Sequence, residues 1–440
     1  MLRRACNNLP MRTSIRCALL LAGALMLQGS WTRAQTPVPT DAETVPATTP
    51  EPAEPPESLP ERSTETVARA AAAAPAATTA AEPVSLDEIR RFVSVFRAVK
   101  QAYVDPIDDN RLMRAAIRGL LLDLDPHSAY LDRDASAALN EQASGAYDGL
   151  GIEVLQQPDR SLLVIAPIDD TPAARAGIRS GDVIVAIDGR RIDADSVDGA
   201  VDTMRGEPGT SITLTIERES SAEPLQFTLM RDTIRVSSVR VRMLEPAYAY
   251  LRIATFQSDT GAEVTRKLKA LRSESKQPLR GLVMDLRSNP GGLLNAAIEV
   301  ADAFLDAGTI VSTKGRLPYA NADYAARKGD LLDGAPIVIL SDSGTASAAE
   351  VLAGALRDHK RALIMGSASF GKGSVQTVLP MDNGDSVKLT TARYYTPSGV
   401  SIQASGVVPD IELPEHAELQ ALETAPSLRE RDLPGHLRGD

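Results

Sequence analysis

The chain has 440 residues and a formal net charge of −11, with 43% hydrophobic and 4% aromatic residues. This length allows two or three domains with hydrophobic cores. The acidic balance and the lack of a basic face argue against nucleic-acid binding. The two cysteines, Cys6 and Cys17, both lie near the N-terminus. The rest of the sequence therefore excludes a cysteine nucleophile, a thiolate metal site and a disulfide framework, and we expect no metal and no cofactor.

Residues 1–34 have the pattern of a secretory signal peptide. Arginines at positions 3, 4, 12 and 16 precede the apolar run Ala18–Leu27, and Ala34 is a small residue at the expected cleavage point. The apolar run is too short for a membrane-spanning helix of about 20 residues. We therefore predict export to the periplasm or cell envelope, with an uncleaved interfacial anchor as the alternative.

Residues 35–84 and 85–146 differ sharply in composition. The first range is rich in Pro, Ala, Thr and Glu and has few large apolar residues, which predicts a disordered linker. The second begins with a capping box at Ser85 and continues with an apolar stripe that includes Phe92 and Phe96. We predict a helical region there, with a second helix over about 110–122.

Residues 147–232 contain two glycine-bearing motifs. Gly-Leu-Gly-Ile at 149–152 leads into an expected strand, and Ser-Gly-Asp-Val-Ile-Val-Ala-Ile-Asp-Gly follows at 180–189. With these motifs at this distance, the range resembles a PDZ domain. The backbone N–H groups of the first motif are suited to bind a free carboxylate, while the edge strand adds the bound peptide as a further strand. The residues predicted to bind the peptide are Gly149, Leu150, Gly151, Ile152, Val201 and Met204. The alternative is that the first motif is only a tight turn.

Residues 233–413 alternate expected strands and helices, which predicts an α/β domain with a partly parallel sheet. Expected strands include 248–256, 282–286 and 337–340, and expected helices include 259–273, 293–305 and 347–358. Residues 414–440 form a polar tail to which we assign no structure.

The candidate nucleophile and base lie in one part of this domain. Ser347 follows the apolar run Pro336–Ser341 and starts Ser-Ala-Ala-Glu, a capping box. Unpaired N–H groups and the positive helix dipole at such a corner favour an oxyanion and lower the pKa of a nearby lysine. Lys372 lies between Gly371 and Gly373, which allow close backbone approach and an inward-pointing side chain. Taken alone, Ser347 would be an ordinary N-cap and Lys372 a surface lysine.

The segments GTASAAE and FGKGSVQ resemble the motifs of the carboxyl-terminal processing peptidases, also called tail-specific proteases. In that family G-S-A-S-A-S-E carries the nucleophilic serine and F-G-K-G-x-V-Q carries the base, which fall on Ser347 and Lys372. The resemblance also implies that Gln376 orients the lysine and that Asp358 supports the site.

This resemblance covers roughly residues 86–413 and departs from the family pattern at Thr345 and Ala349, outside the Ser-Lys pair. It implies a crotonase-like ββα protease domain with an inserted PDZ domain. It further implies protein or peptide substrates with free, apolar C-termini, a homo-oligomer, and room for an activating adaptor.

The expected reaction is peptide-bond cleavage through an acyl-enzyme on Ser347, with Lys372 as base. The pKa of Lys372 must fall well below its usual value of about 10.4 for the amine to be neutral. The oxyanion would bind the N–H of Ala348 and, from the Arg-Ser-Asn-Pro-Gly-Gly loop, that of Gly291 with Gly292 next to it. The alternative is that Pro-Gly-Gly is only a turn and helix start. None of the four histidines, at positions 127, 359, 416 and 436, is placed by the sequence as a direct base.

Two other functions stay open at this point. A catalytically silent PDZ scaffold would bind C-terminal peptides without cleaving them, although both Ser347 and Lys372 are intact. A crotonase-like acyl-transfer enzyme would share the sheet, although an export signal and a PDZ module do not fit cytosolic acyl-CoA chemistry.

Overall fold

The computed structural model of the chain describes residues 84–157, 161–192, 197–275, 277–413 and 428–439. These residues belong to one unit of the chain, Ser63–Asp440, and the unit Met1–Arg62 lies outside them. The predicted signal peptide, residues 35–83 of the predicted linker and residues 414–427 of the tail also lie outside the described residues. No helix in the described ranges is long and apolar enough to cross a membrane.

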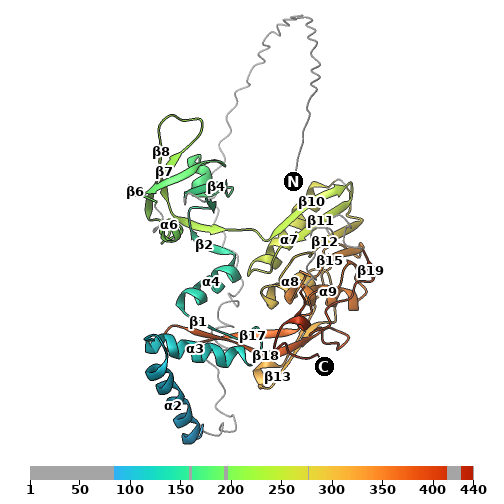
Figure 1. Cartoon of the computed structure of the whole chain (residues 1–440). Coiled ribbons are helices and arrows are strands. Elements are labelled where there is room, and N and C mark those ends of the chain that lie inside the picture. Colours follow the sequence, from blue (N-terminus) through green and yellow to red (C-terminus); the bar gives the residue numbers. More distant parts are fainter. Residues whose placement is uncertain (1–83, 158–160, 193–196, 276, 414–427, 440) are drawn as a thin grey trace, which may run out of the picture. The chain divides into compact units, whose positions relative to one another are not determined.

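Three helices lie between residues 86 and 144 (Figure 1). They are α2 (Leu86–Ala102), α3 (Asp109–Leu122) and α4 (Arg133–Ser144). Each helix is capped by a side chain that accepts a hydrogen bond from a backbone N–H of the first turn. The capping residues are Ser85, Asp108 and Asp132, respectively. Helices α2 and α3 confirm the two helices expected from the sequence, and α4 lies within the predicted helical region 85–146, in which no separate helix had been given for it. No residue of α2 is buried, and of its apolar stripe Phe92 is exposed and Phe96 is partly buried.

The segment predicted as a PDZ module contains an antiparallel sheet with the strand order β3-β4-β5-β7-β8. Its members are β3 (Ile152–Gln156), β4 (Leu162–Pro167), β5 (Val183–Ile187), β7 (Ser211–Glu217) and β8 (Leu225–Met230), with β6 (Arg190–Arg191) beside β5. Two short helices, α5 (Pro172–Ala176) and α6 (Val197–Met204), connect strands. The module is entered through β2 (Ala146–Gly149) and left through β9 (Asp232–Arg235), which pair with each other. Fully buried residues such as Leu162, Ile184 and Leu214 form its core.

A second six-stranded sheet carries the domain that follows. Its order is β10 (Val239–Glu245), β11 (Tyr248–Ile253), β12 (Gly281–Asp285), β15 (Ile337–Ser341), β16 (Ala362–Gly366) and β19 (Ile411–Glu412). Strands β11 to β19 are parallel, and β10 is antiparallel at one edge. The connecting helices are α7 (Thr260–Glu274), α8 (Leu294–Asp302) and α9 (Ala348–Asp358). This arrangement confirms the α/β prediction, because parallel neighbours require helical crossovers.

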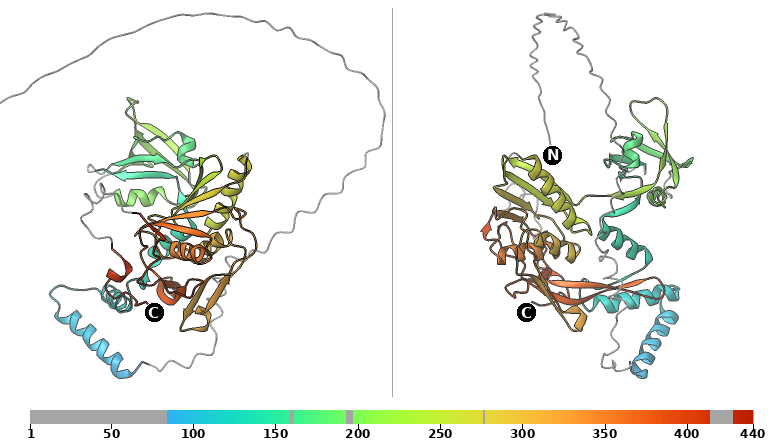
Figure 2. Two further views of the ribbon diagram at one scale, coloured as in Figure 1. Left: turned by 90° about the vertical axis from the view of Figure 1, so that its right-hand side faces the viewer. Right: turned by 180° about the vertical axis from the view of Figure 1, so that it is seen from behind.

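An antiparallel sheet completes the same domain (Figure 2). It consists of β1 (Ala129–Leu131), β18 (Ser386–Tyr395), β13 (Thr309–Gly315) and β14 (Ala322–Ala325), and β17 (Ser374–Pro380) also pairs with β18. Two short 3-10 helices are η1 (Pro318–Ala320) and η2 (Glu430–Asp432). Strand β1 lies between α3 and α4 in the sequence, so the N-terminal helical region contributes a strand to this sheet.

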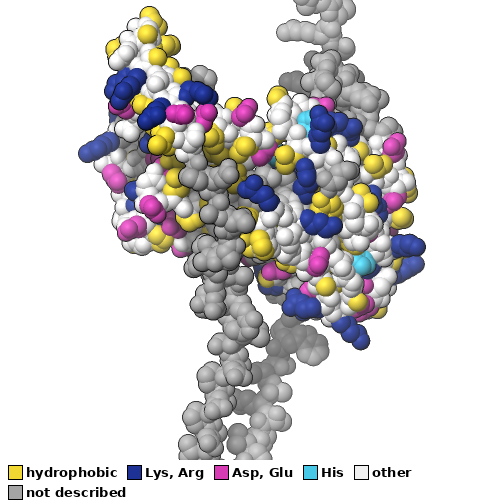
Figure 3. Space-filling model, turned by 90° about the horizontal axis from the view of Figure 1, so that it is seen from below, with side chains coloured by type: hydrophobic (Ala, Val, Ile, Leu, Met, Phe, Trp, Pro, Cys, Tyr) yellow, Lys and Arg dark blue, Asp and Glu magenta, His cyan; other side chains and the backbone are white. Residues whose placement is uncertain are grey.

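The surface carries both signs of charge. On the face shown in Figure 3, Lys and Arg side chains lie among Asp, Glu and apolar side chains rather than in one continuous patch. Among the described residues, no cluster of three or more His, Asp or Glu side chains is arranged to hold a metal ion.

Candidate active site

The candidate nucleophile lies where β15 passes through a turn into α9. Ser347 is the N-cap of α9 and has φ 55° and ψ −116°. A positive φ is uncommon for a residue with a side chain, and such strained positions are found preferentially at functional sites. The first nine residues of α9, Ala348–Leu356, are all buried, so this well-packed helix holds the serine in a fixed position.

Glu350 connects the serine corner to the lysine loop. Its side chain is fully buried, and one oxygen, Oε2, accepts hydrogen bonds from the backbone N–H of Ser347 at 2.7 Å and of Lys372 at 2.9 Å. The other oxygen, Oε1, accepts from the Gly371 N–H at 2.8 Å and from the Ser369 hydroxyl at 2.5 Å. Because two N–H groups share a single oxygen atom, the backbones of Ser347 and Lys372 lie side by side.

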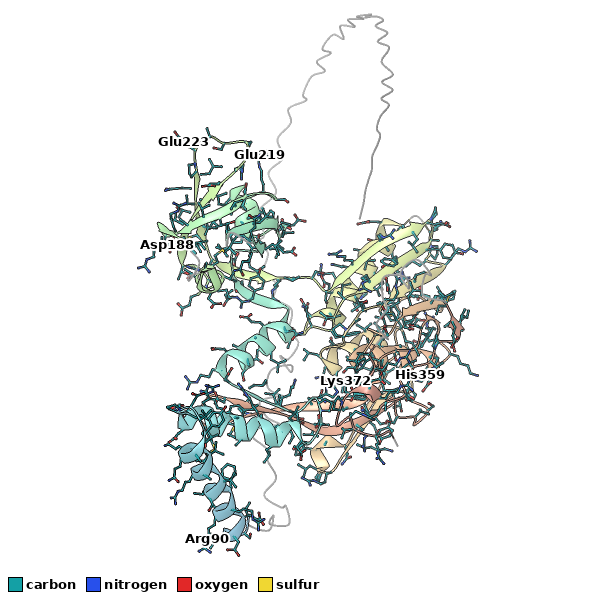
Figure 4. All side chains as sticks on the ribbon, viewed as in Figure 1. Arg90, Asp188, Glu219, Glu223, His359 and Lys372 are labelled. Carbon is teal, nitrogen blue, oxygen red and sulfur yellow. The ribbon has the colours of Figure 1, made fainter. Side chains whose placement is uncertain are left out.

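Burial has opposite consequences for the two ionisable groups of this region. It raises the pKa of Glu350 to about 7, against the four hydrogen bonds that favour the carboxylate. Burial is also the main cause that lowers the pKa of Lys372, with Lys388 lowering it further, while Glu430, Glu350 and Asp125 raise it. The position of Lys372 on the ribbon is labelled in Figure 4. A lysine with a lowered pKa can hold a neutral amine, which is the form that accepts a proton.

The side chain of Tyr394 adds a second connection between the two loops. Its hydroxyl donates to the carbonyl oxygen of Lys372 and is also hydrogen-bonded to the Ser347 side chain. Burial, together with the charge of Glu350, raises the pKa of Tyr394 well above its ordinary value, so the phenol is neutral. In the described part of the chain no hydrogen bond joins Lys372 Nζ to the Ser347 hydroxyl, and the Ser-Lys pair stays a prediction.

The predicted oxyanion loop packs directly on the serine corner. Gly291 has φ 98°, and a Cβ atom added there would lie 2.8 Å from Ser347 Cβ and 2.9 Å from Ala348 N. Only glycine permits this approach. The N–H of Gly291 donates to the side-chain oxygen of buried Asn289 at 2.9 Å, whereas the N–H groups of Ala348 and Gly292 have no acceptor among the described residues.

The two residues assigned supporting roles, Gln376 and Asp358, lie on different elements and form hydrogen bonds with other residues than Ser347 and Lys372. Gln376 is on β17 and donates to Ser374 Oγ at 3.0 Å and Thr390 Oγ1 at 3.2 Å, with no hydrogen bond to Lys372 among the described residues. Asp358 is at the other end of α9 and accepts from the Ser398 N–H at 3.0 Å. Asp358 therefore holds the Tyr-Tyr-Thr-Pro-Ser-Gly loop, and the role of Gln376 stays a prediction.

The described histidines all have partners away from Ser347. His359 Nε2 lies 2.7 Å from the Thr309 carbonyl oxygen, and His436 Nδ1 lies 3.0 Å from the Leu433 carbonyl oxygen. His127 Nε2 lies 2.8 Å from Glu430 Oε2. His416 lies outside the described residues. This arrangement favours Lys372 over a histidine as the base.

The residues predicted to bind a peptide surround the edge strand of the PDZ-like sheet. Ile152 starts β3, which is at the open edge, and Gly151 has φ 75°. Leu150 and Met204 are buried in the core of the module, and Val201, on α6, is 37% exposed. An open edge strand is the feature used for peptide binding by β-augmentation.

Sequence reasoning did not identify every residue that contacts the serine or the lysine loop. Glu350 was recognised as the acid that ends the Ser-Ala-Ala-Glu capping box, but only as part of a helix cap. Tyr394 begins the segment Tyr-Tyr-Thr-Pro-Ser-Gly at 394–399, to which no role was assigned from the sequence. Gln403 and Glu430, which contact the lysine loop, gave no signal, because their environment depends on segments far away in the sequence.

Comparisons with known proteins identify relatives over most of the chain. Residues 247–413 match the family model for peptidase family S41, residues 163–218 match the PDZ domain, and residues 58–135 match the N-terminal domain of the activating protease CtpB. The chain is similar to the carboxy-terminal-processing protease of Bartonella bacilliformis, with 45% identity over 353 residues, covering 80% of this chain and 81% of the relative.

Two further relatives have comparable coverage. The carboxy-terminal processing protease CtpA of Bacillus subtilis is 33% identical over 342 residues, covering 77% of this chain and 72% of the relative. A solved structure named photosystem II D1 C-terminal processing protease is 32% identical and covers 75% of this chain and 94% of that chain, with a TM-score of 0.43.

Proposed function

This chain belongs to peptidase family S41 as a serine-type carboxyl-terminal processing peptidase with a PDZ domain, and on that premise we propose that it cleaves with Ser347 and Lys372. The observation that carries this proposal is the single Glu350 oxygen that accepts from the backbone N–H groups of both residues. Family membership sets aside the silent scaffold and the acyl-transfer enzyme.

In the proposed reaction, Lys372 accepts a proton and then donates it in each of the two steps. Lys372 takes the proton of the Ser347 hydroxyl as Oγ bonds to the substrate carbonyl carbon, and the ammonium then returns it to the leaving amine as the C–N bond breaks. A water molecule next attacks the acyl carbon while Lys372 takes its proton. The ammonium then returns this proton to Ser347 Oγ as the C–Oγ bond breaks, which releases the acid product and restores both the serine hydroxyl and the neutral lysine. Gln376 orients the lysine in this scheme.

The oxyanion that forms in both steps would bind at the start of α9. The free N–H of Ala348 is the first donor, because it lies at the positive end of a buried helix. Gly291 is the second donor in our proposal. Since its N–H is bonded to Asn289, that bond must open for it to donate, or else the free N–H of Gly292 takes this role.

The test of the Ser-Lys pair is the cleavage of an unfolded protein with an apolar C-terminus. S347A and K372A should each abolish cleavage while substrate binding persists, and K269A, an exposed lysine on α7, should leave the rate unchanged. Because only the neutral amine accepts a proton, kcat/KM should rise with pH through the lowered pKa of Lys372. Retained cleavage in K372A would refute the pair.

We further propose that the PDZ module captures the free C-terminus of the substrate. The support is the open edge strand β3 together with the motif Gly149–Ile152 and the side chains of Val201 and Met204. Amidation of the substrate carboxylate should slow cleavage strongly. An unchanged rate would exclude this role for the motif.

The remaining proposals concern location and assembly. Residues 1–34 support export to the periplasm or cell envelope, which N-terminal sequencing of the fractionated protein tests. The exposed apolar face of α2 supports a homo-oligomer, and the match to a CtpB N-terminal domain leaves room for an activating adaptor. Sedimentation of the chain with and without F92E, a substitution on that face, tests self-association.

A further inference from the structure

A carboxylate in the C-terminal segment, residues 428–439, is buried without an obvious structural reason. Glu430 lies in η2 and has 0% exposure, although the segment around it is polar and irregular. Its carboxylate accepts from His127 Nε2, at 2.8 Å and 3.0 Å for its two oxygens, and from Gln403 Nε2 at 3.0 Å. A buried carboxylate is costly unless it is fully paired, so these contacts must be specific.

The same segment holds the lysine loop directly on one side of Lys372 and through Gln403 on the other side. On one side, the Glu430 N–H donates to the Phe370 carbonyl oxygen at 3.2 Å. On the other side, Gln403 Oε1 accepts from the Gly373 N–H at 2.8 Å, while its amide nitrogen binds Glu430. A Cβ atom on Gly373 would lie 2.6 Å from Gln403 N, so the contact leaves no room for a side chain.

His127 fixes the far side of the carboxylate and is itself held in place. It belongs to the turn after α3, where Asp125 accepts from the backbone N–H groups of His127 and Ser128. Asp125 also accepts from the Thr390 hydroxyl on β18. The N-terminal region and the C-terminal segment therefore meet at Glu430, next to the lysine loop.

Charges face Lys372 from several elements. Lys388 on β18 contributes a positive charge, and Glu430 on η2, Glu350 on α9 and Asp125 before β1 contribute negative charges. Burial pushes the pKa of Glu430 up, but hydrogen bonds from His127 and Gln403 outweigh it and hold the pKa below its ordinary value of 4.5. Glu430 is thus ionised at neutral pH, and it is the first of the acids that raise the pKa of Lys372.

We propose that Glu430 is a positioning residue for Lys372, which holds the lysine loop in place and stabilises the ammonium formed when Lys372 accepts the serine proton. This inference rests on the proposed function, because it requires Lys372 to be the base. It assigns a task to a segment that lies beyond residue 413, where the peptidase family match ends.

The test is the pH dependence of the full-length E430Q chain, with fluorescently labelled casein as the probe substrate. Glutamine keeps the shape of the side chain and removes the charge. A lysine without this neighbouring charge is a weaker base with a lower pKa. We expect kcat at high pH to fall about tenfold and the acidic limb of the profile to move down by about one pH unit. R431Q, which removes an exposed charge from the same short helix, is the matched control and should move neither quantity.

If E430Q loses rate equally at every pH, and the acidic limb of its pH–rate profile stays in its original place, Glu430 has a structural role only and the inference is overturned. E430D keeps the charge but shortens the reach to His127 and Gln403, so kcat should fall several-fold while the limb stays. If E430Q does not fold, an E430D chain with unchanged kcat overturns the positioning role. K372A is measured in the same series: cleavage by K372A rejects the proposed function, whereas an inactive K372A with an unshifted E430Q rejects only this inference.

Discussion

Helices α2 and α9 start with the same motif, Ser-x-x-Glu, but use it differently. In α2, Ser85 has φ −63° and its hydroxyl accepts from the Glu88 N–H at 3.3 Å, while Glu88 pairs with Arg91 at the surface. In α9, Ser347 has φ 55°, and the Glu350 carboxylate binds the serine N–H and three donors from the 369–372 loop. One motif is an ordinary helix cap, and the other joins two distant segments at the candidate active site.

The difference shows that a capping motif sets where a helix begins but not what the capping residues do. Helix α2, which Ser85 caps, has no buried residue, so the side chains of Ser85 and Glu88 form only local contacts. Helix α9, which Ser347 caps, is buried from its first residue, which keeps water away from Glu350. The Glu350 carboxylate therefore forms its hydrogen bonds with other segments of the protein. Of the following four predictions, the first three compare matched positions of the two helices, and the fourth concerns the C-terminal end of α9.

The largest contrast concerns the two serines. S347A should reduce cleavage by at least about 10³-fold, because no other hydroxyl can form the acyl-enzyme. S85A should leave kcat/KM within about twofold and cost about 1 kcal/mol or less in the free energy of unfolding, as for a lost N-cap. Initial rates and urea unfolding of both variants test this contrast, and equal rates in the two variants would remove the distinction.

The two glutamates should differ next. In E350Q the amide NH₂ meets donors on every side, so kcat/KM should fall about 10–100-fold and the free energy of unfolding by about 3 kcal/mol. E88Q breaks only a surface pair with Arg91 and should change the free energy of unfolding by less than about 0.5 kcal/mol. Kinetics and denaturant melts at one pH measure both. A fully active, stable E350Q would show that the shared oxygen is not needed to hold the two loops.

Apolar residues of the two helices should differ in stability rather than in rate. Leu352 on α9 is fully buried, and L352A should cost about 2–5 kcal/mol in the free energy of unfolding. Phe92 on α2 is 48% exposed, and F92A should cost below about 1 kcal/mol when the chain is a monomer. Melting temperatures at several protein concentrations measure both. A loss in F92A that grows with concentration would instead indicate that a second copy covers α2.

The smallest effect is expected at the C-terminal end of α9. Burial raises the pKa of Asp358, but hydrogen bonds from Thr396 and Ser398 outweigh it and lower the pKa below 3.8. The folded chain therefore gains stability from this carboxylate at neutral pH and loses it as the pH falls through the lowered pKa. D358N should cost about 1 kcal/mol at pH 7, flatten this acid dependence and change kcat/KM less than about threefold. A large loss of rate would place Asp358 in the lysine network instead.

Local patterns predicted much of this molecule. The Ser85 and Ser347 motifs marked the starts of α2 and α9, and the glycines around Lys372 marked a tightly packed loop. Apolar runs such as Pro336–Ser341 marked buried strands, because strand and helix periodicity depend on neighbouring residues. The bounds of helix α4 were not predicted within the helical region, since its sequence, Arg133–Ser144, has no strong apolar stripe.

The C-terminal segment was the part that local patterns could not predict. Residues 428–439 are polar and irregular, yet Glu430 is fully buried between His127 and Gln403. Its hydrogen-bond partners are 27 and 303 positions away in the sequence. No periodicity or spacing signals such a contact, because it depends on which segments the folded chain brings together.

By itself, then, the sequence determined the positions of the serine, the lysine and the glycine turns, together with the elements that carry them, because these follow from neighbouring residues. Only the tertiary structure decided that one oxygen of Glu350 serves both Ser347 and Lys372, and that Glu430 is placed beside the lysine loop. The physical reason is burial: a carboxylate removed from water must find donors, and the fold supplies them from distant segments.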